Sequence, residues 1–239
     1  MSIKVLRLFL APAWIFSISM LASPPSISTS DLEEARDRQD LAALEGMISQ
    51  YQQAAHANSQ LPENQYRTAL AYSYAAEVAI EGRDKKKAEQ LAEAGVEAAK
   101  KAVSLNEANS EYHRLLGELC GQVIPANPVF GSLKYGQCAR DEINKAIQLD
   151  NGLALAYVSR GVGNFYLPPS MGGGVDLALK DFDKAISLDH NLAEAYLWRG
   201  IALRKSNRNS EARQALQRAV QLDPNRLWAK QQLEKTPAQ

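Results

Sequence analysis

Three stretches in the second half of the chain repeat one spacing of small and large apolar residues. In each, an alanine is followed four residues later by a large apolar residue and seven residues later by another alanine. Positions spaced in this way share one face of a helix, and the small residues on that face let a second helix approach closely. The three sets are Ala139, Ile143 and Ala146; Ala178, Phe182 and Ala185; and Ala212, Leu216 and Ala219.

A glycine precedes each set, and it lies four residues after a ring-bearing side chain. This spacing predicts a partner helix for each of the three helices. The alternation of polar and apolar residues that is typical of strands does not occur along the chain, so we predict an all-α fold of antiparallel helix pairs. The glycines are Gly117, Gly161 and Gly200, and the ring-bearing residues are His113, Tyr157 and Tyr196.

The last pair is the most regular. Residues 193–226 form a unit of 34 residues, in which a proline follows the second helix and cannot continue it. The unit resembles the tetratricopeptide repeat (TPR) and has that family's period. The resemblance implies a right-handed solenoid of stacked antiparallel helix pairs, as in exported bacterial TPR proteins. Its positions are Tyr196, Gly200, Leu203, Ala212, Leu216, Ala219 and Pro224.

Two further units lie upstream, in residues 110–153 and 154–192, so that three TPR units cover residues 110–226. Both are longer than the last unit, and Asn151 and His190 stand where the family has proline. They resemble the repeat in their helices and depart from it in the connection between the helices.

The flanking parts of the chain are predicted to be helical as well. Residues 29–109 are expected to hold N-terminal helices that include a degenerate repeat, with one amphipathic helix from about Asp31 to Ala57. Residues 227–239 are expected to form the capping helix and tail that such stacks require.

Residues 1–28 have the layout of a secretory signal peptide. Lys4 and Arg7 form a positive head, and the apolar run from Leu8 to Leu21 is shorter than the roughly 20 residues that span a membrane. We expect cleavage at an undetermined site and export, to the periplasm or out of the cell. The alternative is an uncleaved segment that anchors the protein to the membrane.

Composition narrows the class of function. The 27 basic and 27 acidic residues cancel, which argues against a nucleic-acid partner. Two Cys and three His do not have the spacing of a zinc site, and motifs for hydrolases or phosphate-binding loops do not occur. We therefore expect no enzymatic activity, no metal and no cofactor, and after signal cleavage no stable membrane insertion.

Cys120 and Cys138 are expected at neighbouring ends of two antiparallel helices. In an oxidising compartment they would form a disulfide. The alternative is a pair of small buried thiols.

Two units carry insertions between their helices. The stretch from Gly117 to Ala139 has 10 extra residues, and that from Gly161 to Ala178 has 5, relative to the last unit. Both insertions are expected to be loops on one edge of the solenoid, where insertions often map to a binding face. They either pack on each other as a lid or form one wall of a ligand site, with Phe130 and Met171 in that wall.

The TPR resemblance also implies that the first helix of each unit lines a concave groove for peptides or proteins. Carried over to this sequence, the groove has an apolar middle between polar flanks, which suits an apolar segment of a partner. Its residues are Arg114, Glu118, Leu155, Val158, Val162, Phe165, Tyr166, Leu197, Ile201 and Arg204.

Two functions follow from this groove. The first is an exported, non-enzymatic scaffold that binds a protein or peptide partner. The alternative is a carrier of an apolar small molecule enclosed by the groove and the two insertions. Self-association into a homo-oligomer remains open, because a second copy could fill the groove.

Overall fold

The computed structural model describes residues 28–126 and 128–238. Within them the chain forms eleven α-helices and two short 3₁₀ helices, and the predicted all-α fold is confirmed. The helices are α1 (Thr29–Asp37), α2 (Leu41–Ala57), α3 (Pro62–Glu81), α4 (Lys85–Leu105), α5 (Ser110–Val123), η1 (Ile124–Ala126), α6 (Pro128–Leu149), α7 (Ala154–Tyr166), η2 (Pro169–Met171), α8 (Val175–Leu188), α9 (Ala193–Lys205), α10 (Asn209–Leu222) and α11 (Leu227–Glu234).

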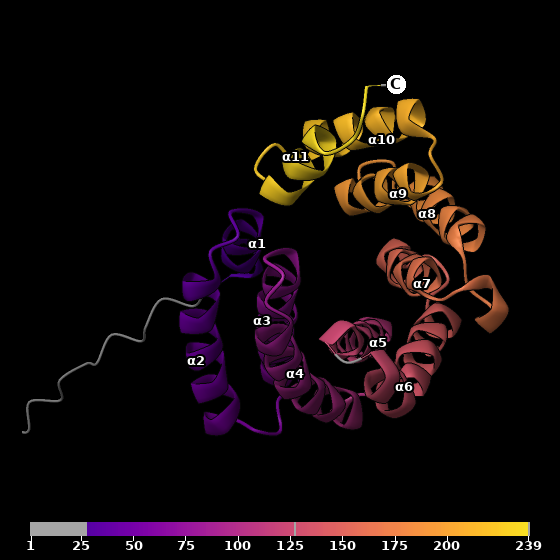
Figure 1. Cartoon of the computed structure of the whole chain (residues 1–239). Helices are drawn as coiled ribbons and strands as arrows, with labels where there is room; N and C mark the ends of the chain where they lie inside the picture. The colour runs from indigo at the N-terminus through magenta and orange to yellow at the C-terminus, as the bar shows by residue number, and fades with distance from the viewer. Residues whose placement is uncertain (1–27, 127, 239) are drawn as a thin grey trace, which may run out of the picture.

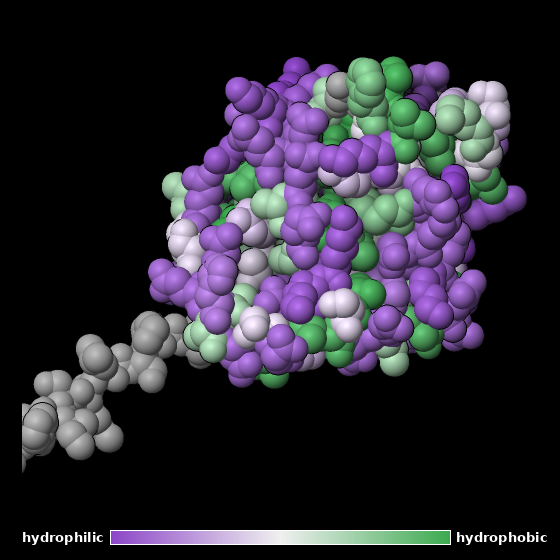
Figure 2. Space-filling view, turned by 90° about the horizontal axis from the view of Figure 1, so that it is seen from below, coloured by the Kyte–Doolittle hydropathy of each residue, from purple (hydrophilic) through white to green (hydrophobic). Residues whose placement is uncertain are grey.

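Consecutive helices pair and stack as a solenoid, as expected. The pairs are α3 with α4, α5 with α6, α7 with α8 and α9 with α10. Figure 1 shows α3, α5, α7 and α9 on the inside of a curl, with their partners outside. The curl continues until α11 lies beside α1. We call the inner surface formed by α3, α5, α7 and α9 the concave face. Seen from below in Figure 2, the molecule is mostly hydrophilic.

Glycine is required where the two helices of a pair cross. A Cβ atom added at any of the three repeat glycines would lie within 2.6 Å of a side chain on the partner helix, which no packed core allows. The clashes would be Gly117 with Ile143, Gly161 with Phe182 and Gly200 with Leu216.

Substitution of Gly161 by alanine tests this packing. The new Cβ would lie 2.5 Å from a ring carbon of Phe182, which is fully buried. We expect Gly161→Ala to lower the free energy of unfolding by about 1–3 kcal/mol, because overpacking forces the ring out of place. Gly163→Ala, on the same helix with open space around it, should stabilise by about 0.5–1 kcal/mol. Urea unfolding measures both; equal effects would contradict the crossing argument.

The N-terminal region contains two helices where the sequence predicted one from about Asp31 to Ala57. The chain breaks at Gln39, whose φ is 56°. Asp40 then starts α2, because its carboxylate accepts a hydrogen bond from the backbone N–H of Ala43 at 3.0 Å. The expectation of a single helix is therefore wrong.

The first insertion is also not a loop. After the short η1 the chain enters α6 at Pro128, a residue suited to the first turn of a helix, so most of the extra residues lengthen α6. Gly131 lets this extension pack closely, since a Cβ there would lie 2.9 Å from the Cα of Ile124. The second insertion is irregular apart from η2, with Gly172 and Gly174 at φ values of 81° and 114°.

Most of the predicted signal segment lies outside the described residues. Ser28, its last residue, is the N-cap of α1: its hydroxyl accepts from the N–H of Asp31, and the Asp31 carboxylate accepts from the N–H of Ser28. Among the residues that the structure describes, no helix is both long enough and apolar enough to cross a membrane.

Candidate binding surface on the concave face

The two ends of the curl meet at a buried arginine. Arg226 lies directly before α11, where its backbone N–H donates to the carboxylate of Asp223 at 3.1 Å. Its side chain is 2% exposed and crosses to α3, where the guanidinium donates to Glu77 at 2.6 Å and to both carboxylate oxygens of Glu81. The Nε of Arg226 lies 3.8 Å from Asp37 on α1. Arg226 and Glu77 are 149 residues apart in sequence.

Further polar residues surround this contact. Arg36 donates to Asp37 from Nε and Nη2, at 2.9 and 2.7 Å, and stacks 4.7 Å from the ring centroid of Tyr74. Glu194 on α9 accepts from Trp198 Nε1 at 2.8 Å. Gln231 on α11 donates to Gln39 at 3.1 Å. We call the charged groups of this junction the seam; they are Arg36, Asp37, Glu77, Glu81, Glu194 and Arg226.

The seam holds more carboxylates than guanidinium groups, and burial changes their titration. Burial and, to a smaller extent, the nearby Glu77 together raise the pKa of Glu194 to about 7, against the opposing effect of Arg226 and Arg36. Burial and Glu77 likewise raise the pKa of Glu81 to about 7 against the effect of Arg226. These carboxyls bind protons near neutral pH because their charged forms are poorly solvated.

The seam should therefore be more stable at low pH than at high pH. An unfolded Glu titrates near 4.3, so between about pH 4.5 and 7 the folded state holds more protons, and stability falls as the pH rises through this window. Glu194→Gln keeps the acceptor for Trp198 and removes the charge. We expect this variant to gain about 1–3 kcal/mol at pH 8 and little at pH 4.5.

Urea unfolding at the two pH values measures the difference. Glu97→Gln is the control, since the Glu97 side chain is 75% exposed. A gain of equal size at both pH values, or a loss at pH 8, would contradict the interpretation.

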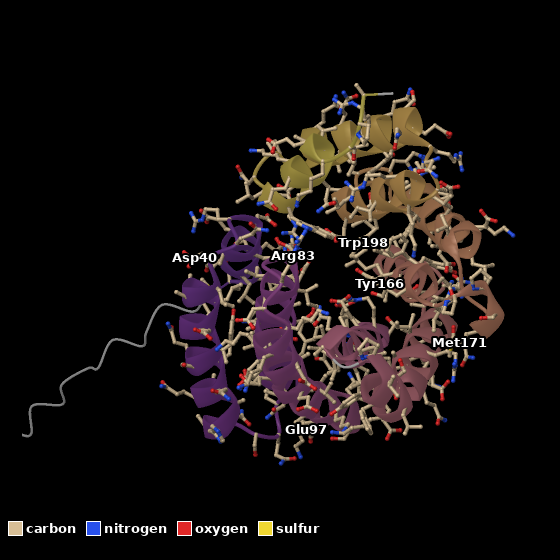
Figure 3. All side chains as sticks on the ribbon, in the orientation of Figure 1. Asp40, Arg83, Glu97, Tyr166, Met171 and Trp198 are labelled. Carbon is tan, nitrogen blue, oxygen red and sulfur yellow. A yellow bond between two sulfur atoms is a disulfide. The ribbon has the colours of Figure 1, made fainter. Side chains whose placement is uncertain are left out.

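An aromatic cluster lies beside the seam. Phe165 and Tyr166 on α7 have ring centroids 5.1 Å apart, Tyr166 and Trp198 6.2 Å, and Trp198 and Trp228 5.3 Å. Figure 3 shows Tyr166 and Trp198 within the curl. Tyr166 is 59% exposed, so an aromatic ring of the concave face is open to a partner.

A second polar group ties three inner helices together. Arg114 is 4% exposed and donates to Glu111 at 2.6 and 2.7 Å and to Glu118 at 2.5 Å. Glu118 also accepts from Ser73 on α3 and Ser159 on α7, both at 2.9 Å. We call Arg114, Glu111 and Glu118 the Arg114 group.

The predicted apolar middle of the groove is not an open surface. Val158, Phe165, Leu197 and Ile201 are each 8% exposed or less and pack in the core, so they offer a partner little apolar area, and the expectation is wrong on this point. Leu155 and Val162 are half-buried. Tyr166 remains accessible. The part that Leu155, Val162 and Tyr166 have in binding stays a prediction.

The two polar flanks are engaged within the protein. Arg114 is buried between its two carboxylates. Arg204 donates to the carbonyl oxygen of Gln232, to its side chain and to Thr236, at 3.0, 2.6 and 3.2 Å. Arg204 thus holds α11 onto α9.

The insertions do not combine with the groove. Met171 is 65% exposed and lies on the outside of the curl, away from Tyr166 (Figure 3). Phe130 is 69% exposed and lines a cavity of about 170 Å³ with residues of α4, α5 and α6. A larger cavity of about 330 Å³ lies between α2, α3 and α4. Neither of these two cavities is lined by Phe165 or Met171.

Cys120 on α5 and Cys138 on α6 form a disulfide, with their Cα atoms 6.1 Å apart. It closes the base of the hairpin that contains η1 and the extension of α6. A disulfide that closes a loop of this length stabilises a protein by roughly 3 kcal/mol, because it lowers the conformational entropy of the unfolded chain.

Replacement of both cysteines by alanine tests that contribution. We expect the double variant to lose about 2–4 kcal/mol of unfolding free energy relative to the oxidised protein. Reduced wild type is the control, and it should unfold close to the variant. If oxidised and reduced wild type unfolded alike, the disulfide would have no such role.

The site residues that sequence reasoning missed lie at the seam and in the aromatic cluster beside it. They come from helices at opposite ends of the chain, and the repeat pattern carries no signal for the curl that joins them. The spacing of four between Glu194 and Trp198 was a usable sign, because such residues share a helix face. The missed residues are Glu77, Glu81 and Arg226 of the seam and Trp198 and Trp228 of the aromatic cluster.

Comparison with known families identifies the chain. Residues 29–167, more than half of it, match the family described as regulator of microtubule dynamics protein 1-3. The chain belongs to this family. Residues 193–226 match the tetratricopeptide repeat separately, which confirms the TPR resemblance. No curated protein matches this family member.

This family member is similar to several solved structures. A thermophilic TPR protein of Thermus thermophilus is 16% identical with a TM-score of 0.61, and the match covers 87% of this family member and 97% of that chain. The HusA haemophore from Porphyromonas gingivalis is 21% identical with a TM-score of 0.48, covering 83% and 96%. At these identities the likeness to the Thermus protein shows the fold alone.

Proposed function

We propose that this family member is an exported, non-enzymatic scaffold that binds a protein or peptide partner along its concave face. The observation that carries the proposal is the accessible ring of Tyr166, which stands beside Trp198 inside the curl. Accessible aromatic rings are typical of residues that dominate binding energy at protein interfaces. A protein partner also agrees with the family description, since microtubules are protein assemblies.

Export rests on two features. Lys4, Arg7 and the apolar run from Leu8 to Leu21 have the order of a secretory signal. The Cys120–Cys138 disulfide favours an oxidising compartment, where such bonds persist.

The alternative, a carrier of an apolar small molecule, has less support. Such a carrier needs an enclosed apolar cavity that buries most of its ligand. The apolar side chains expected to line one, such as Leu197 and Ile201, are packed in the core.

A capture experiment with two variants tests the scaffold. Tyr166→Ala removes the accessible ring, and Phe130→Ala removes a somewhat more exposed ring on α6 as a control. Bound proteins and small molecules from an extract of the source cells are identified by mass spectrometry. We expect a reproducible protein partner that Tyr166→Ala reduces at least tenfold and Phe130→Ala retains.

Retention of the partner by Tyr166→Ala would refute binding at the concave face. An apolar compound that co-purifies without any protein partner would favour the carrier.

A further inference from the structure

The two insertions hold the most exposed large apolar side chains among the residues that the structure describes. Leu133, Val129 and Phe130, on the first two turns of α6, are 84%, 75% and 69% exposed. Met171 of η2 is 65% exposed. The regular unit of residues 193–226 has no insertion, so the stacking of helix pairs does not require these side chains. Exposed apolar side chains that gather in one place are typical of a surface that contacts a protein or a membrane.

These side chains lie on one edge of the solenoid. Arg114 of α5 donates to Ser159 of α7, and Ser159 donates to Glu118 of α5, so the two helices lie side by side. Because each pair is antiparallel, α5 and α7 run in the same direction, and an insertion follows the C-terminal end of each. In Figure 2 hydrophobic side chains gather along the upper edge of the molecule. We call the four exposed side chains the apolar edge; they are Val129, Phe130, Leu133 and Met171.

The first insertion is held in a fixed shape. The Cys120–Cys138 disulfide closes its base, and Gly131 lets α6 pack closely against η1. The Tyr135 hydroxyl donates to Glu93 of α4 at 2.8 Å. Because the segment is already ordered, contact with a partner costs it little conformational entropy.

The size of the apolar edge argues against a second copy as its partner. Four side chains of this kind expose roughly 400 Å² of apolar surface. Two copies that met through this edge would bury about 800 Å² in total, below the roughly 1,200 Å² of a stable protein interface. Leu133 and Val129 also stand out from the surface, so they do not line a groove that could receive a side chain of a partner.

A lipid bilayer requires neither matched shape nor a minimum interface. Separate apolar side chains on one edge can enter the boundary between headgroups and acyl chains, and the binding strength scales with the apolar area that they bury. The apolar run of the N-terminal segment ends at Leu21, seven residues before Ser28, the N-cap of α1. Where that segment is retained, it would hold the described fold within about 25 Å of a membrane.

We propose that the apolar edge binds reversibly to the surface of a lipid bilayer. Its four side chains would enter the headgroup boundary, and the exposed ammonium of Lys134 would reach the headgroups beside them. Met171 lies outside the curl (Figure 3), and α6 is an outer helix (Figure 1). The inference therefore goes beyond the proposed function, because the concave face stays free for a protein partner.

Charge contributes little to this contact. Residues 82–93, 128–137 and 167–180, which carry the apolar edge or border it, hold six basic and four acidic side chains. Lys134 pairs with Glu93 at 3.2 Å, and Lys87 pairs with Glu45 of α2, a further acidic residue. The basic surplus is thus small. Burial of apolar surface is expected to drive the binding, so a zwitterionic bilayer is the appropriate probe.

Flotation with vesicles of phosphatidylcholine alone tests the proposal. The protein is purified after export, and mass spectrometry of the intact chain determines its N-terminus. We expect the wild type to be half-bound at roughly 0.1–1 mM lipid. The double variant Leu133→Asn/Met171→Asn should bind at least tenfold more weakly, because it removes two apolar side chains without adding charge.

Leu61→Asn is the matched control. Leu61 is 43% exposed and precedes the first residue of α3, at the opposite end of that helix from the connection to α4. This variant should bind like the wild type. Urea unfolding checks that all variants keep the wild-type stability, which the exposure of the three positions leads us to expect.

Tryptophan quenching measures the contact where a retained N-terminal segment holds every variant on the vesicles. Leu133→Trp places an indole on the apolar edge, and Leu61→Trp places one at the start of α3. With vesicles of brominated phosphatidylcholine, we expect Leu133→Trp to be quenched beyond the wild type and Leu61→Trp to match the wild type.

Three results would overturn the proposal. The first is a chain without the apolar run that stays unbound at about 5 mM lipid, or a double variant that binds as tightly as the wild type. The second is a lack of added quenching in Leu133→Trp. The third is binding that requires anionic lipid and disappears at about 0.5 M salt, which would indicate attraction between charges alone. A wild-type dimer that the double variant converts to a monomer in analytical ultracentrifugation would assign the edge to a second copy instead.

Discussion

The contact of Arg226 with Glu77 and Glu81 turns an open stack of helix pairs into a closed curl. The stacking of the pairs does not depend on it, since the core lies between neighbouring helices and the repeat glycines set their distance. Closure brings α1, α3, α9 and the start of α11 together around the charged groups of the seam. The aromatic cluster lies beside the seam.

A polar junction holds the ends of the curl differently from an apolar one. Burying charged groups costs solvation free energy that their mutual attraction only partly returns, so the seam adds little net stability. Its geometry is nevertheless specific, because a guanidinium has a fixed set of donors and carboxylates must meet them. The way in which the two ends of the curl meet is thus fixed by the direction of these hydrogen bonds.

Features that depend on residues close in sequence, such as the helix pairs, could be predicted from the sequence. Contacts between the two ends of the chain could not. Gly200 and Leu216 lie in one helix pair, so their spacing was enough to predict the pair. Arg226 and Glu77 are 149 residues apart, and nothing local indicates that they meet. Leu197 was placed on the groove by family position, yet adjacent helices bury it to 1%. The length of the first insertion predicts a loop, whereas Pro128 begins a helix there.

Because Arg226 follows Glu77 by 149 residues, it is synthesised well after the helix that it contacts. A ribosome completes all four inner helices before it adds the residue that joins the ends of the curl. A partner that meets the emerging chain reaches the inner helices from the side. One that meets the finished protein reaches them along the axis of the curl, or after the seam has opened. The rate of partner loading should therefore differ between nascent and completed chains even where the final affinity is the same.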